Sequence, residues 1–183
     1  MFIAQKLRKE NIVEYLLYMW QIEDLIRACQ LNIDIINKQI IAPYPISDEE
    51  KKTLFEWYES LIDMMLREDV KQEGHLQINK NIILHLDELH HLLLKHGVDP
   101  LYNAQYQYII PHVNQLRAQQ SITNLSDIEI CLNFQYGIML LKMKKTEISQ
   151  KTLQAQSNIA KYLILLAKNF NRYQNGELKF DED

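Results

Sequence analysis

The stretch that most constrains the fold is NIVEYLLYMWQIEDLIRAC, which covers residues 11–29. On a helix of 3.6 residues per turn, Tyr15 and Met19 lie on one face, while Leu17 and Trp20 cover much of the opposite side. The first half of this helix is therefore apolar on nearly all sides. Leaving its second face in water would forfeit roughly 1.5–3 kcal/mol for each large side chain. We therefore predict a central helix, surrounded by other helices or by a partner chain.

Glycine and proline are scarce, at four residues each in a chain of 183. That leaves too few turn residues for a many-stranded β architecture. Helix-start signals are present instead, such as the capping box that Ser47 forms with Glu50. We therefore predict the all-α class: a single helical bundle of about six helices with short connections over residues 1–176, one of them kinked by proline, followed by an acidic frayed tail at residues 177–183.

Three segments carry local expectations. Residues 1–10 are expected to be helical and continuous with the central helix. Pro111 falls inside the apolar stripe of a helix that begins at Asp99-Pro100, and its ring removes a backbone hydrogen bond, which predicts a kink. Gly137, in a helix apolar on more than one face, costs about 1 kcal/mol relative to alanine. It predicts that another backbone passes close by.

The charge balance argues against polyanionic partners. The net charge is −4, and a general binder of nucleic acid or of anionic membranes relies on cationic contacts with phosphates. Residues 48–73 carry a net charge of −5 and residues 138–172 a net charge of +6, which we interpret as solvated or mutually facing helices. No apolar run is longer than 162–167, which is too short to span a bilayer, so we predict no membrane association.

The two cysteines indicate the compartment. Cys29 and Cys131 lie in helical apolar patterns far apart in the sequence, so they are expected to be buried free thiols of a reducing environment. The N-terminal decapeptide has no apolar core of signal-peptide length. We therefore predict a cytoplasmic protein.

One helix is rich in histidine, with four of the six histidines in residues 85–96. Glu88 and His91 have the Glu-x-x-His spacing of carboxylate-bridged di-metal bundles, which need that pattern twice, whereas here it occurs once. One hypothesis is a metal site at Asp87, His90 and His91, whose motif a dimer would double across a two-fold axis. The alternative is a solvated helix face stabilised by weak i, i+4 contacts.

The direction of these side chains weakens the metal hypothesis. If Leu86 and Leu93 face the core, Asp87 and His91 point to the opposite side, and His90 flanks the apolar stripe. The sequence predicts no cofactor.

A second cluster lies in the central helix, at Trp20, Glu23, Asp24 and Arg27. Glu23 and Asp24 are spaced to pair with Arg27, and Trp20 lies one turn before Asp24. Unpaired charges beside a core are too costly to keep, so we expect these groups to pair with one another or with a partner. The cluster is therefore either a structural ion pair or a pocket in which Arg27 binds an anionic ligand. Candidate lining residues, which are otherwise ordinary core, are Gly137, Tyr102, Tyr106 and Tyr108.

Signatures of common catalytic sites are missing from the sequence. There is no glycine-rich phosphate loop, no Gly-x-Ser-x-Gly elbow, no His-Glu-x-x-His and no Cys-x-x-Cys. Lysines interleaved with tyrosines in the last two helices suggest a nucleic-acid contact only weakly, because no helix-turn-helix pairing accompanies them. These observations favour a non-enzymatic protein.

Two blocks of sequence resemble a known family. Residues 4–28, AQKLRKENIVEYLLYMWQIEDLIRA, and residues 134–149, FQYGIMLLKMKKTEIS, are similar to an uncharacterised domain-of-unknown-function family of small all-helical proteins from Bacteroidetes. The similarity extends over the whole chain. It implies a cytoplasmic bacterial protein, and it implies no activity, cofactor or site residue.

The leading hypothesis is a non-enzymatic helical interaction or regulatory protein that forms a homo-oligomer, most simply a homodimer, or binds a helical partner. It rests on the two helices that are apolar on more than one face. The alternative hypothesis is a ligand- or metal-binding bundle, conceivably an enzyme, that uses either the Trp20/Asp24/Arg27 cluster or the Asp87/His90/His91 helix.

Overall fold

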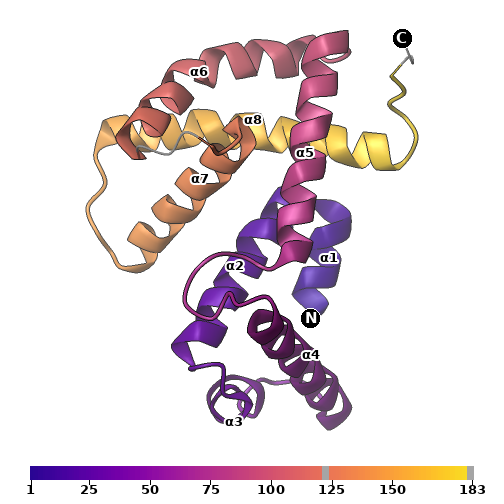
Figure 1. Cartoon of the computed structure of the whole chain (residues 1–183), viewed down its shortest axis with the longest axis vertical. Coiled ribbons are helices and arrows are strands. Elements are labelled where there is room, and N and C mark those ends of the chain that lie inside the picture. The colour runs from indigo at the N-terminus through magenta and orange to yellow at the C-terminus, as the bar shows by residue number, and fades with distance from the viewer. Residues whose placement is uncertain (121–123, 181–183) are drawn as a thin grey trace. The chain divides into compact units, whose positions relative to one another are not determined.

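The computed structural model describes residues 1–120 and 124–180 (Figure 1). Within these ranges every regular element is helical, which confirms the all-α class, and the described helices number eight rather than about six, with one additional π-helix. They are α1 (Phe2–Glu10), α2 (Ile12–Ala28), α3 (Ile33–Ile36), the π-helix η1 (Asn37–Ile41), α4 (Asp48–Arg67), α5 (Gln77–His96), α6 (Pro100–Gln120), α7 (Asp127–Met143) and α8 (Gln150–Gln174). No helix in the described ranges is long and apolar enough to cross a membrane.

The chain divides into two compact units. Unit 1 comprises Met1–Arg8 and Glu14–Asn81, and unit 2 comprises Lys9–Val13 and Ile82–Asp183. A single domain over residues 1–176 stays a prediction.

In unit 1, the predicted central helix is α2. Met19 and Ile26 on one face are buried, and so are Leu16 and Trp20 on another, each with at most 2% of its surface exposed. Leu17, on the side opposite Met19, is half-buried, so α2 buries most of its apolar surface within this chain, as its sequence pattern predicts. Helix α4 starts at the predicted capping box, where the Glu50 carboxylate accepts from the Ser47 amide at 2.9 Å.

The prediction that α1 runs on into α2 is wrong. The first helix ends at Glu10, and the next begins at Ile12, because the side chain of Asn11 accepts a hydrogen bond from the Val13 amide at 3.1 Å. Asparagine is a preferred residue at helix starts for this reason. The one-turn π-helix η1 was also not predicted from the sequence.

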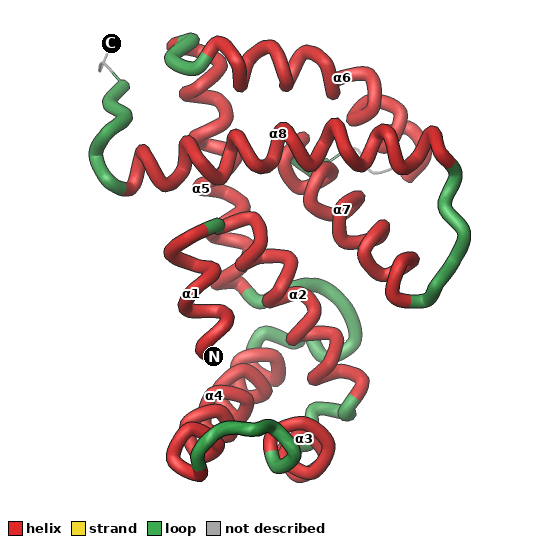
Figure 2. Tube along the Cα trace, turned by 180° about the vertical axis from the view of Figure 1, so that it is seen from behind, coloured by secondary structure: helices red, strands yellow, loops and turns green. Residues whose placement is uncertain are grey.

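In unit 2, α6 and α8 run antiparallel, and α7 packs against both (Figure 2). Asp99, which caps α6, hydrogen-bonds Asn169, whereas Gln105 farther along α6 bonds the backbone of Asn158. Their core consists of buried side chains from all three helices: Tyr102, Ile109, Val113, Ile128, Cys131, Leu132, Ile159, Tyr162 and Leu166.

Two local predictions concern α6 and α7. Pro111 lies inside α6, whose ribbon bends in both views, in agreement with the predicted kink (Figures 1 and 2). The prediction of a close backbone at Gly137 is wrong within this chain, because a Cβ placed there would meet no described atom within 4 Å. Gly137 therefore destabilises α7 relative to alanine, and no packing against another segment of this chain compensates for that loss of stability.

The predicted acidic tail is described only in part. Leu178 is 7% exposed, and the Phe180 ring lies 5.4 Å from the ring of His96 and 5.7 Å from that of Tyr173. Residues 181–183 lie outside the described residues, so fraying of the tail stays a prediction.

Candidate functional site

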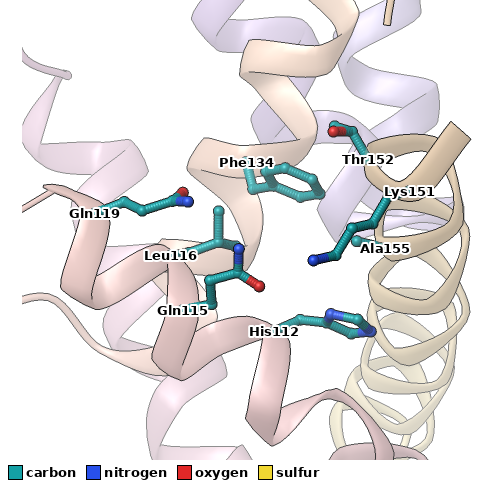
Figure 3. A pocket seen from close by; sticks show the side chains of 8 residues that line it. All are labelled: His112, Gln115, Leu116, Gln119, Phe134, Lys151, Thr152 and Ala155. Atoms are coloured by element: carbon teal, nitrogen blue, oxygen red, sulfur yellow. The ribbon is translucent and has the colours of Figure 1, made fainter. Parts of the chain in front are cut away.

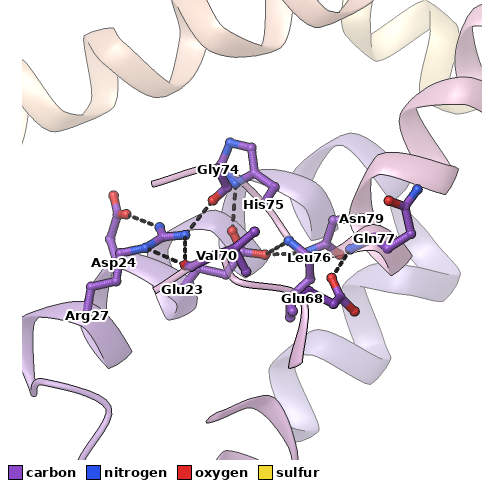
Figure 4. A network of polar contacts seen from close by, with 10 residues as sticks. All are labelled: Glu23, Asp24, Arg27, Glu68, Val70, Gly74, His75, Leu76, Gln77 and Asn79. Carbon is purple, nitrogen blue, oxygen red and sulfur yellow. Dashed lines mark hydrogen bonds and ion pairs between the residues drawn. The ribbon is translucent and has the colours of Figure 1, made fainter. Parts of the chain in front are cut away.

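Glu23 of α2 is the most deeply buried charged side chain among the described residues of unit 1, with 0% of its surface exposed. Its Oε1 accepts from the Leu76 amide at 3.1 Å and from Asn79 Nδ2 at 2.7 Å, and its Oε2 lies 2.6 Å from His75 Nδ1 (Figure 4). A carboxylate is tolerated in such a place only when it is hydrogen-bonded and paired. Here it sits where α5 begins, at the positive end of that helix dipole.

Arg27, one turn farther along α2, hydrogen-bonds the backbone of the segment between α4 and α5. Its guanidinium donates to the carbonyl of Val70 at 3.0 and 3.3 Å and to the carbonyl of Gly74. It also forms the predicted ion pair with Asp24, at 2.8 Å. Backbone carbonyls outside helices need partners when they lie against a core, and Arg27 supplies donors in the fork geometry that can serve several of them.

Trp20 completes this group. Its ring stacks on the His75 ring with 4.1 Å between centroids and 12° between planes, and 1% of Trp20 is exposed. Trp20, Glu23 and Arg27 therefore all contact the same segment, residues 68–79. We call these three residues with their partners in that segment the α2 latch.

The α2 latch consists of residues on α2 and of their partners in residues 68–79, and the sequence pattern indicates only the residues on α2. Helical spacing places Trp20, Glu23 and Arg27 on adjoining positions of one helix. Their partners lie 43 to 56 residues away, in the irregular connection between α4 and α5 and in the first turn of α5, so their contribution was not predicted. The Glu23 carboxylate and the Arg27 guanidinium are hydrogen-bonded by the chain itself, which favours a structural role, whereas the buried Oδ1 of Asn79 has no hydrogen-bond partner among the described residues. Ligand binding by Trp20, Glu23, Asp24 and Arg27 stays a prediction.

In unit 2, His90 of α5 is the buried member of the histidine-rich helix. It is 3% exposed, and its Nδ1 lies 2.7 Å from the Tyr102 hydroxyl and 2.9 Å from the Tyr162 hydroxyl. The two hydroxyls are 2.8 Å apart. Periodicity placed His90 at the edge of the apolar stripe, whereas the structure places it inside the core, because two tyrosines offer it hydrogen bonds there.

The other two predicted metal ligands lie differently. His91 is exposed, and its Nδ1 lies 2.7 Å from the backbone oxygen of Asp87 and 3.8 Å from a carboxylate oxygen of the same residue. Among the described residues there is no group of three or more histidine, cysteine, aspartate or glutamate side chains that could hold a metal ion. Metal binding by Asp87, His90 and His91 stays a prediction.

Burial sets the protonation of the His90 cluster. It lowers the pKa of His90 to about 4, since a charged imidazolium would lose its hydration there. It also raises the pKa of Tyr102 and of Tyr162 above the usual value. At neutral pH the cluster is therefore three neutral groups that share hydroxyl protons.

Acidification is expected to destabilise the protein through His90. The pKa is about 4 in the folded protein against an ordinary 6.5, so between these values the unfolded chain binds more protons. The free energy of unfolding then falls as the pH falls, by up to about 1.4 kcal/mol per pH unit. Thermal unfolding followed by circular dichroism from pH 6.5 down to pH 4 measures this slope. His90→Gln should flatten it and the exposed His91→Gln should not; equal slopes in both variants would contradict the assignment.

A polar pocket of about 430 Å³ opens beside His90. Tyr106 donates to Asp127 at 2.6 Å, and Arg117 contacts Asp127 at 2.5 Å and the Leu125 carbonyl at 2.7 Å. Burial, followed by the bond to Asp127, raises the pKa of Tyr106. The predicted residues Asp87, His90 and His91 line this pocket, whereas Arg117 and Asp127 were not singled out from the sequence.

Comparison with known proteins yields a family and no function. No curated protein and no solved structure matches the sequence. A family model does match, over residues 1–177, which is nearly the whole chain. The chain belongs to the family described as Domain of unknown function (DUF4924).

Proposed function

We propose that the protein is a non-enzymatic helical interaction protein that acts as a homodimer, with the outer face of α7 as the interface. The supporting observation is an apolar face on α7 that this chain leaves partly open. Helix α2, the other helix with apolar residues on several sides, is largely buried within the chain, so α7 carries the proposal.

The outer face of α7 consists of Tyr136, Gly137, Leu140 and Met143, which share one side of the helix by their i, i+4 and i+7 spacing. Met143 is 67% exposed, and Tyr136 and Leu140 are half-buried. No atom of the described ranges lies within 4 Å of a Cβ built on Gly137. Adjoining exposed apolar side chains are typical of interaction surfaces, and a glycine among them lets a second helix approach closely.

Charge favours a second copy of the chain as the occupant. Helix α7 carries Glu129 in its first turn, and Lys142, Lys144 and Lys145 lie at and just beyond its end, whereas Asp127 is held by Arg117 and Tyr106 of the same chain. Two copies of α7 that cross antiparallel around a two-fold axis bring the acidic start of one toward the basic end of the other. The same surface patch then serves both subunits.

The oligomeric state tests the proposal. Sedimentation equilibrium of the wild type should give the mass of a dimer, and a Leu140→Lys/Met143→Lys double variant should give a monomer, because it places four charges in the interface. Ile164→Lys, at a 60% exposed apolar residue of α8, is the matched control and should remain dimeric. A monomeric wild type, or a double variant that stays dimeric, would refute the proposal.

Gly137→Ala supplies a second readout. It should stabilise the isolated subunit by about 1 kcal/mol, because alanine favours the helix and the added Cβ meets no neighbour. It should also weaken the dimer, because the added methyl group separates the two helices. Thermal unfolding of the Leu140→Lys/Met143→Lys monomer with and without this change measures the first effect, and sedimentation of the single variant measures the second. A stabilised subunit with an undiminished dimer would place the interface elsewhere.

The alternative proposal is a ligand- or metal-binding bundle, an enzyme included. It is favoured by the 430 Å³ pocket at Asp87, His90 and His91. Native mass spectrometry of protein purified from its own cells without chelator separates the two proposals. Extra mass of a metal or a small molecule would support this alternative, and a bare dimer would support the interaction protein.

We also propose that the protein acts in the cytoplasm of a bacterium of the Bacteroidetes. Cys29 and Cys131 are free and buried, which suits a reducing compartment. The sequence resemblance described above supports the bacterial source.

A further inference from the structure

We propose that a pocket among α6, α7 and the first turns of α8 binds a small carboxylate that carries one aromatic ring or a short branched chain. This α8-start pocket is distinct from the outer face of α7, so the proposal does not depend on the oligomeric state. It lies wholly within unit 2.

The size and walls of the pocket suit an apolar body. Its volume is about 180 Å³, and a cavity of roughly 150 Å³ lined by apolar side chains accommodates benzene. Leu116 of α6, Phe134 of α7 and Ala155 of α8 form the apolar wall, and all three are half-buried. Three helices thus meet around a space for one ring.

The polar groups converge on one side of this space. In Figure 3 the Lys151 side chain reaches across the pocket, with its ammonium group toward Gln115 and His112. None of these three side chains forms a hydrogen bond or ion pair with another described residue. A cation and an amide donor are therefore available for a ligand, and ammonium–carboxylate hydrogen bonds are among the strong ones.

The electrostatics select a negative charge. No acidic residue lines the pocket among the residues that the structure describes, and the first turn of α8 contains no acid, whereas α4 and α7 begin with acidic residues. Lys151 is the second residue of α8, so its charge adds to the positive end of the helix dipole. A ligand whose carboxylate lies near Lys151 and whose apolar part packs against Phe134 would form an ion pair and an apolar contact at the same time.

Phenylacetate is the probe we would use, with phenylacetamide as the uncharged analogue and acetate as the analogue without a ring. Titration of the wild type should shift the NMR signals of Lys151 and Ala155 amides saturably with phenylacetate, and much less with either analogue. The charge-assisted bond predicts at least about tenfold weaker binding of phenylacetate to Lys151→Met, since 1.4 kcal/mol corresponds to tenfold in affinity. Lys161→Met, at an exposed lysine of the same helix, is the matched control and should bind as the wild type does.

A variant that fills the pocket distinguishes binding inside the pocket from binding of phenylacetate to the charge of Lys151 at the surface. Ala155→Phe should abolish the phenylacetate shifts while the far-ultraviolet circular dichroism stays helical. If that variant unfolds, Thr152→Leu, which narrows the same wall, replaces it. The proposal is overturned if phenylacetate and phenylacetamide bind equally, if Lys151→Met and Lys161→Met lose affinity alike, or if no saturable shift occurs at these amides.

Discussion

Replacing Glu23 with alanine is expected to lower the free energy of unfolding by about 2–6 kcal/mol, because two buried hydrogen-bond donors lose their acceptor. Three donors lose their acceptor: the Leu76 amide, the Asn79 side chain and the His75 ring. The amide and the Asn79 side chain lie in a buried environment, where each unsatisfied group costs about 1–3 kcal/mol.

The measurement is urea unfolding followed by tryptophan fluorescence. Both tryptophans of the chain, Trp20 and Trp57, lie in unit 1, so the signal reports the unit that holds the α2 latch. Glu59→Ala, at an exposed carboxylate of α4, is the control and should change the midpoint little. A Glu23→Ala protein of wild-type stability would contradict the structural role and would strengthen the hypothesis that this cluster binds a ligand.

Trp20→Ala is expected to lower the free energy of unfolding by about 3–5 kcal/mol, because it removes the largest fully buried side chain and leaves a cavity. It also removes the surface on which His75 stacks, and so frees the ring that holds Glu23. The two losses belong to one network, so the double variant with Glu23→Ala should lose less than the sum of the single variants.

Trp57→Ala is the matched control for this substitution. Trp57 is half-buried and contacts the edge of Tyr58 at 5.1 Å between ring centroids, so its removal should cost clearly less. Urea unfolding of both variants by far-ultraviolet circular dichroism compares them without relying on the deleted fluorophore. An equal loss of unfolding free energy in Trp20→Ala and Trp57→Ala would show that the stacked, buried position of Trp20 adds nothing to the stability of the protein.

Several features of the fold could be predicted because they depend on residues close together in the sequence. Ser47, Asp99 and Ser126 each accept a hydrogen bond at a helix start, as their spacing predicts, and Gly97 takes a positive φ of 62° after α5. The all-α class follows from the same local signals, summed along the chain.

Local signals also explain the errors. A single side-chain bond at Asn11 separates α1 from α2 where the apolar pattern continues, so periodicity alone joined them. At Gly137 the cost of glycine in a helix predicted a packing neighbour, whereas the structure leaves the space open. Neither position could be decided by its own helical pattern.

By itself the sequence determined the helical class, the helix starts and one side of the α2 latch, since these follow from residues three to four apart on one helix. Only the tertiary structure decided which polar groups are buried and what satisfies them. Glu23 meets donors more than 50 residues away, and His90 meets a hydroxyl 72 residues away. A buried polar side chain is stable only with partners at hydrogen-bond distance, and partners from other segments become neighbours only when the chain has folded.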